Sequence, residues 1–116
     1  ETARTPWTVN AFAETYAMAA FDHYAELKES AAKITAERSW YMQELAKLSV
    51  SSYPSQVNYI TIDTGREASA VRDAMLSHGI LVRDCTSFTL PTCIRVSVET
   101  REKNRRVLEA LAECLR

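Results

Sequence analysis

The sequence predicts an α+β fold: a small, mostly antiparallel three-stranded sheet packed by helices, with a long N-terminal helix before it. Residues 11–50 contain neither glycine nor proline and are rich in Ala, Glu, Lys and Leu, which favours a helix. After them, short apolar and β-branched runs alternate with helix-like stretches and turn signals. The resulting order is helix, helix, strand, helix, strand, strand, helix, which is typical of a small sheet covered on one face by helices.

Length and composition narrow the class of protein. The chain has 116 residues, 47% of them hydrophobic and 25% charged, which fits one globular domain with a single core. Its net charge of −1 gives no general attraction to nucleic acid or to an anionic membrane. No apolar run approaches the roughly 20 residues that cross a bilayer. We therefore expect neither nucleic acid nor a membrane as a partner.

The cysteines indicate the cellular compartment of the chain, and the scarcity of glycine indicates that the chain is a segment of a larger protein. Its three cysteines form no CxxC pair, and the first residues lack the order of a signal peptide, so we expect free thiols in a reducing cytoplasm. Only Gly65 and Gly79 occur, although an independent enzyme usually needs more glycines in its ligand-binding loops. The sequence also starts without methionine. We therefore expect a segment of a larger protein.

The first half of the chain predicts an extended lead-in and then a helix. Asn10, or Thr8 before it, is placed to cap the helix that follows. Forty helical residues would be about 60 Å long, more than a small domain can cover, so we expect a bend within residues 22–29. One half would then pack on something outside this chain. A coiled-coil dimer is the alternative, although Arg38 interrupts its short seam. We assign residues 1–49 to this lead-in and helix.

The second half, residues 50–116, predicts the α/β domain itself. Three short strands are expected from their apolar and β-branched residues and the turns that flank them: residues 57–62, 80–83 and 93–98. Thr64 and Glu67 have the spacing of a capping box, which predicts a helix that starts there and ends at Gly79. Thr100 is placed to cap the last helix.

Two arginines stand at strand level, where a small domain is half buried. Arg83 closes the apolar run of the second strand, and Arg95 interrupts the third strand on the face that it shares with Ser97. A buried unpaired charge is strongly disfavoured, so each arginine needs solvent, an ion pair or an anionic ligand. For Arg83 the ion-pair alternative is Asp84; for Arg95 the alternative is solvent. We favour an anionic ligand, because the guanidinium fork suits carboxylate and phosphate.

Other side chains that carry chemistry are better explained structurally. His23 and His78 have no acidic partner at a recurring spacing, and we expect both at the surface or at helix ends. Cys85 and Cys93 match no common zinc spacing and are expected as buried thiols. The lysines occupy helical positions that we expect to be solvated: Lys28, Lys33, Lys47 and Lys103. None of these residues predicts a catalytic group within this chain.

Four phrases, in this order and over nearly the whole chain, resemble the C-terminal part of fold-type-I pyridoxal-phosphate enzymes. They are Pro6-Trp7-Thr8-Val9-Asn10-Ala11, Tyr53-Pro54-Ser55-x-x-Asn58-Tyr59, Gly79-Ile80-Leu81-Val82-Arg83-Asp84-Cys85 and Ile94-Arg95-Val96-Ser97-Val98, with Asn104 following. Within that superfamily the chain resembles the group that joins histidinol-phosphate aminotransferase and threonine-phosphate decarboxylase. The first phrase and the cysteine after Arg83-Asp84 favour the decarboxylase of cobalamin biosynthesis.

The resemblance implies roles for particular residues. Arg95 corresponds to the arginine that binds the substrate α-carboxylate, and Arg83 to the arginine that contacts the substrate phosphate. Asn10 and Asn58 match recurrent positions without an assigned role. The cofactor pyridoxal 5′-phosphate and its Schiff-base lysine would belong to a large domain outside this sequence, so this chain alone would bind no cofactor and be inactive. The family is also dimeric, which implies a homodimer.

Three interpretations of function follow. The first is the C-terminal domain of an L-threonine-O-3-phosphate decarboxylase, and the alternative is that of a histidinol-phosphate aminotransferase. Both can use the same two arginines, since the orientation of the substrate decides which bond breaks. The third is a helical interaction module without a small-molecule site. Glu99, where the family often has glycine, and the short loop at residues 86–92 depart from the family pattern.

Overall fold

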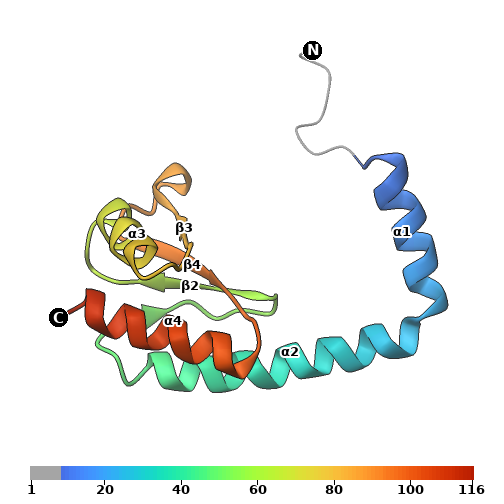
Figure 1. Cartoon of the computed structure of the whole chain (residues 1–116), viewed down its shortest axis with the longest axis horizontal. Coiled ribbons are helices and arrows are strands. Elements are labelled where there is room, and N and C mark those ends of the chain that lie inside the picture. The colour runs from blue at the N-terminus through green and yellow to red at the C-terminus, as the bar shows by residue number, and fades with distance from the viewer. Residues whose placement is uncertain (1–8) are drawn as a thin grey trace, which may run out of the picture. The chain divides into compact units, whose positions relative to one another are not determined.

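The computed structural model describes residues 9–116 (Figure 1). The residues Pro6, Trp7 and Thr8 of the first phrase lie outside this range. The described part of the chain divides into two compact units, one that ends at Ala32 and one that comprises Lys33–Arg116. Each unit is described by itself. No helix within the described range is both long and apolar enough to span a membrane.

The first unit contains α1 (Ala11–Asp22) and the beginning of α2 (Tyr24–Leu45). Asn10 caps α1 as predicted: its Oδ1 accepts a hydrogen bond from the backbone N–H of Ala13 at 2.9 Å. His23 has non-helical dihedral angles between the two helices, so the predicted break is confirmed. No residue of α1 is buried, and the large apolar side chains Phe12 and Tyr16 are 88% and 79% exposed.

The second unit is built on a four-stranded sheet in which every strand pair is antiparallel. Its strands lie in the order β1-β2-β4-β3 and have these bounds: β1 Ser51–Ser52, β2 Tyr59–Asp63, β3 Arg83–Asp84 and β4 Cys93–Ser97. The α+β class is confirmed, but the sheet has one strand more than the three predicted. The additional β1 is two serines long, and serine gives no β signal, so sequence patterning could not find it.

Strand β3 begins three residues later than predicted. Gly79 has φ +71° and ends the preceding helix in the left-handed conformation, as expected for glycine. The Ile80 N–H still donates to the Met75 carbonyl at 3.1 Å, so residue 80 remains hydrogen-bonded to the helix end and is not yet part of the sheet. Only Arg83 and Asp84 reach the ladder beside β4. In the apolar run before Arg83, Val82 is buried and Ile80 partly buried, whereas Leu81 is 81% exposed.

Helices α3 (Ala68–Ser77) and α4 (Arg101–Cys114) complete the second unit, together with a short 3₁₀ turn η1 (Thr86–Phe88). Thr100 occupies the N-cap position of α4, but its side chain makes no capping hydrogen bond, and the capping box at Thr64 does not form. The Thr64 hydroxyl instead donates to the Thr92 carbonyl at 3.0 Å, and the helix begins at Ala68. Thr64 therefore joins the end of β2 to the segment that leads into β4.

All helices of this unit cover the same face of the sheet. The buried residues of β2 and β4 alternate with exposed ones, so Ile60, Ile62, Ile94 and Val96 point into the core. The core receives side chains from the end of α2, from α3 and from α4, which lie together beside the sheet in Figure 1. The other face carries the alternate residues, including Arg95. The site described next lies on that face and at the edge strand β3.

Candidate functional site

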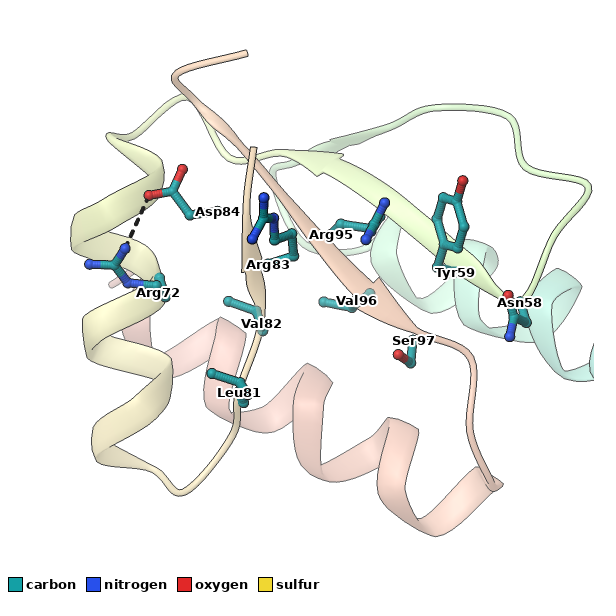
Figure 2. Close-up of a pocket in the computed structure, with 10 residues that line it drawn as sticks. All are labelled: Asn58, Tyr59, Arg72, Leu81, Val82, Arg83, Asp84, Arg95, Val96 and Ser97. Atoms are coloured by element: carbon teal, nitrogen blue, oxygen red, sulfur yellow. Dashed lines mark hydrogen bonds and ion pairs between the residues drawn. The ribbon is translucent and has the colours of Figure 1, made fainter. Parts of the chain in front are cut away.

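A pocket of about 520 Å³ opens where β2, β4 and the edge strand β3 meet (Figure 2). Its lining includes both arginines that the sequence singles out, and it lies wholly within the second unit. The lining residues are Asn58, Tyr59, Arg72, Leu81, Val82, Arg83, Asp84, Arg95, Val96 and Ser97.

Arg83 and Arg95 lie directly opposite one another on neighbouring antiparallel strands. Residues in such a cross-strand pair point to the same face with their Cβ atoms only about 4.5–5.5 Å apart, and like charges in this position destabilise a sheet. Figure 2 shows Arg83 and Arg95 on neighbouring strands, with the Arg95 guanidinium turned towards Tyr59. The register therefore concentrates positive charge at one place on the sheet, a cost that an anionic ligand would offset.

Each of these arginines rests on an aromatic ring. The Arg95 Cζ lies 4.5 Å from the centroid of the Tyr59 ring, and the Arg83 Cζ lies 5.5 Å from that of Phe88. The Nη2 of Arg83 also donates to the Ser87 hydroxyl oxygen at 3.3 Å. Within residues 9–116, neither guanidinium has a carboxylate partner. Stacking orients the two forks and leaves their donors for a ligand.

The carboxylate of Asp84 does not pair with Arg83, so the ion-pair alternative for Arg83 is wrong. Its Oδ2 lies 3.3 Å from the Nη1 of Arg72, and its Oδ1 accepts from the Thr86 N–H at 2.8 Å. The hydrogen bonds from Thr86 lower the pKa of Asp84 most, and the charges of Arg72 and Arg83 lower it further. The carboxylate is therefore ionised and held by Arg72.

Asn58 lies at one end of the pocket, in a loop that several contacts hold in place. Its carbonyl accepts from the Val98 N–H at 2.8 Å, and the Ser55 hydroxyl donates to the Tyr59 carbonyl at 2.6 Å. The buried Arg38 donates to the Val57 carbonyl at 2.9 Å. Arg38, which interrupts the apolar seam of its helix, thus fixes the loop that carries Asn58.

Asn10 is the one sequence-derived candidate that does not belong to this pocket. It lies in the first unit, and its side chain serves as the cap of α1. Among the lining residues that the sequence did not assign to a site are the aromatic Tyr59 and the charged Arg72. The signal for Tyr59 was its alternation within β2, which places it on the face of Arg95 once β2 and β4 pair; the helical Arg72 gave no such signal.

The remaining candidates take structural places. His23 and His78 stand at helix ends, as expected. Cys85 and Cys93 are buried free thiols, and burial raises the pKa of the Cys85 thiol, which makes it a poor nucleophile. Within residues 9–116 no three His, Cys, Asp or Glu side chains gather closely enough to hold a metal ion.

Comparison with known proteins gives a consistent result. The family model described as aminotransferase class I and II matches residues 1–111. A histidinol-phosphate aminotransferase from Symbiobacterium thermophilum is 39% identical over 114 residues, which are 98% of this chain and 32% of that protein. The chain thus spans about a third of the length of the curated relatives it matches.

Two solved structures are also similar. A decarboxylase from Sulfurospirillum multivorans aligns with a TM-score of 0.78 and 27% identity, over 95% of this chain and 33% of that one. A histidinol-phosphate aminotransferase from Sinorhizobium meliloti, in complex with pyridoxal 5′-phosphate, aligns with a TM-score of 0.76 and 30% identity, over 85% of this chain and 28% of that one.

Proposed function

The chain belongs to the class I and II aminotransferase family, and from this premise we propose that it is the part of a pyridoxal-phosphate enzyme that holds the anionic groups of the substrate. The complete polypeptide would transfer the amino group of histidinol phosphate to 2-oxoglutarate. The identity of 39% to a histidinol-phosphate aminotransferase supports this reaction over the decarboxylation that the first sequence phrase favours.

One observation carries the proposal: two opposed guanidinium groups share a pocket with no carboxylate partner among the described residues. Without a ligand, the repulsion between Arg83 and Arg95 destabilises the sheet, and an anion bound between the two guanidinium groups would offset that repulsion. Substrates of transamination here are anionic at one or both ends, since histidinol phosphate carries a phosphate and 2-oxoglutarate carries two carboxylates. The charge of the pocket therefore matches both partners of the reaction.

We assign the two arginines different groups. Arg95 lies on β4, which pairs on both sides, and the Tyr59 ring holds its fork flat, which suits the two parallel hydrogen bonds of a carboxylate. Arg83 lies beside the Ser87 hydroxyl, which can add a donor to a phosphate oxygen. Arg95 thus binds the α-carboxylate of the amino or keto acid, and Arg83 binds the phosphate of histidinol phosphate.

The residues of the pocket do not themselves fit attachment of pyridoxal phosphate. No lysine lines the pocket, and Lys47 and Lys103 pair with Glu44 and Glu99 at the surface. We therefore place the Schiff-base lysine, and with it the cofactor and its bond-breaking chemistry, in the remainder of the polypeptide. A homodimer, as the resemblance implies, is part of this proposal.

A second candidate is decarboxylation of O-phosphothreonine. The similarity to the solved decarboxylase from Sulfurospirillum multivorans favours it, as does the resemblance of the phrase at residues 6–11. O-phosphothreonine carries both a carboxylate and a phosphate, so Arg95 and Arg83 would each bind one group of the same molecule. The two candidates differ in the orientation of the substrate rather than in the groups that bind it.

The test uses the full-length polypeptide loaded with pyridoxal phosphate. Histidinol phosphate plus 2-oxoglutarate should yield glutamate, and O-phosphothreonine should yield little CO₂. The matched control is Arg106→Gln, which removes one exposed arginine outside the pocket and should leave both assays unchanged. Release of CO₂ without glutamate would favour the decarboxylase. No product from either substrate would overturn the proposal.

A further inference from the structure

We propose that Arg72 is a positioning residue that keeps the Asp84 carboxylate from neutralising Arg83, and thereby sets the affinity of the pocket for phosphate-bearing substrates. The inference rests on the proposed function, because it concerns the same anion site. It adds a third arginine to the two that the sequence singles out. Arg72 acts through Asp84 and need not touch the substrate.

Arg72 reaches from α3 to the edge strand. Its Nη1 lies 3.3 Å from the Asp84 Oδ2, and its Nε donates to the Asp73 Oδ1 at 2.9 Å (Figure 2 draws the first of these contacts). The guanidinium therefore lies between two carboxylates. The Asp84 side chain is 17% exposed, whereas that of Asp73 is 65% exposed. Loss of Arg72 would thus affect Asp84 more, because water screens Asp73.

Among the described residues, Asp84 is the only carboxylate that lines the pocket. Adjacent residues of a strand point to opposite faces, so Asp84 turns towards α3 while Arg83 turns into the pocket. The interaction of its carboxylate with Arg83 is nevertheless one cause of its lowered pKa. With Arg72 gone, Arg83 would be the nearest cation that remains among the lining residues, and the negative charge would act on it alone.

The consequence for an anion follows from the charges. Without Arg72 the Asp84 Oδ2 loses its ion-pair partner, so the carboxylate can turn to Arg83 and compete with a bound anion for that guanidinium. The Asp84 Oδ1 keeps its bond with the Thr86 N–H in either case, so the turn that carries Ser87 need not unfold. The expected effect is about a tenfold loss of phosphate affinity, as for one moderately screened charge interaction.

The experiment measures the Kd of inorganic phosphate for the full-length polypeptide by isothermal titration calorimetry, at about pH 8, where phosphate is largely a dianion. Arg72→Gln should raise the Kd about tenfold, and Arg72→Lys, which keeps the charge, should recover most of the affinity. In the Asp84→Asn background, which retains the acceptor for the Thr86 N–H, Arg72→Gln should change the Kd less than about twofold. Arg106→Gln controls for loss of a positive charge elsewhere.

Asp84→Asn would also relieve an unpaired, partly buried carboxylate, so the melting temperature of each variant is measured beside the Kd. The positioning role requires that the Kd of Arg72→Gln rise while its melting temperature stays close to that of the unsubstituted polypeptide. An equal loss in both backgrounds would mean that Arg72 contacts the anion itself, and would overturn the positioning role. An unchanged Kd in Arg72→Gln would overturn it as well. If the unsubstituted polypeptide bound no phosphate, the anion site of the proposed function would fail too. Phosphate binding without transamination would instead leave this inference standing and reject the proposed reaction.

Discussion

Two places in the second unit hold an arginine against an aromatic ring, and they use it differently. Between α2 and α4, the Arg101 Cζ lies 3.8 Å from the Trp40 ring centroid, and its Nε bonds both oxygens of Glu37 at 2.8 and 3.0 Å. In the pocket, Arg95 stacks on Tyr59 but has no carboxylate partner among residues 9–116. The first arginine is satisfied within the fold, whereas the second retains its donors.

The contrast separates an arginine that joins two helices from one that has no carboxylate partner among residues 9–116. The α2–α4 joint is completed by Asn104, which is fully buried and bonds to the Glu99 N–H, the Glu99 carbonyl and Glu37. Its polar groups are paired, which is how buried polar groups stabilise a fold. The pocket places two like charges opposite one another without a carboxylate partner among residues 9–116, a cost that an anionic ligand would offset. Mutations should therefore affect stability at one place and function at the other.

The largest expected effect is at Arg95. Arg95→Met in the full-length polypeptide should lower kcat/KM for transamination. The fall should correspond to a loss of about 2–4 kcal/mol of transition-state stabilisation, as for a severed charge-assisted contact. The substitution also removes the like-charge pair with Arg83, so the melting temperature should not fall with the activity. Steady-state kinetics and thermal denaturation of the same preparation measure both.

Arg106→Gln is the matched control for that experiment, because it removes an exposed arginine from α4. Its kinetics should equal those of the unsubstituted enzyme. If Arg95→Met also retained the kinetics of the unsubstituted enzyme, Arg95 would have no role in substrate binding. The proposed difference in function between Arg95 and Arg101 would then be wrong.

At Asn104 we expect the opposite of the Arg95 result, a loss of stability without a loss of ligand binding. Asn104→Ala removes three hydrogen bonds from a buried position and leaves Glu99 backbone groups unpaired, so we expect a loss of about 1–3 kcal/mol in stability. Phosphate affinity should stay within about twofold, since no pocket residue is touched. Hydrogen exchange of the α4 amides reports the stability locally. A fall in phosphate affinity without faster amide exchange would contradict the assignment of stability to the α2–α4 joint and of binding to the pocket.

A smaller effect is expected at Tyr59, whose ring supports Arg95. Tyr59→Leu should weaken binding of the dicarboxylate 2-oxoglutarate about threefold, because an exposed cation–π contact contributes about 0.5–1 kcal/mol. Tyr59→Phe keeps the ring and should bind 2-oxoglutarate normally. Calorimetric titration of both variants makes the comparison, and a loss in Tyr59→Phe would show that the hydroxyl rather than the stack matters.

The smallest effect concerns pH and the α2–α4 joint. The hydrogen bonds from Arg101 and Asn104 hold the pKa of Glu37 below its ordinary value of 4.5. Since the folded pKa is the lower one, Glu37 contributes stability above pH 4.5 that is lost as the pH falls through the folded value. Glu37→Gln should therefore reduce the dependence of urea stability on acid pH. A denaturation midpoint with the same pH dependence in both proteins would remove Glu37 from that account.

The fold class and the helix break were predicted correctly from the sequence because each leaves a local signal, as do the two arginines that line the pocket. A stretch without Gly or Pro predicts a helix, and an arginine within an apolar strand stands out against its neighbours. The same local patterns failed at β1 and at Thr64. Two serines carry no strand signal, and the hydroxyl of Thr64 bonds to Thr92, 28 residues away, in place of its own helix.

The rest of the site depends on register, which no single segment encodes. That Arg83 faces Arg95 and Tyr59 neighbours Arg95 follows only once β2, β3 and β4 are aligned. Arg72 lies on a helix whose approach to β3 is set by packing in the core. Its contact with Asp84 could therefore not be predicted from sequence spacing.

The position of β3 at the edge of the sheet gives the two arginines different mobility. Arg95 is held by ladders on both sides of β4, whereas Arg83 belongs to a two-residue strand that pairs on one side only. Short edge segments open locally at much lower free energy than central strands. Under the proposed function, one anionic group is recognised from a strand that is paired on both sides, and the other from the sheet edge and its loop. Changes in that edge and loop would then alter the preferred substrate without rebuilding the core.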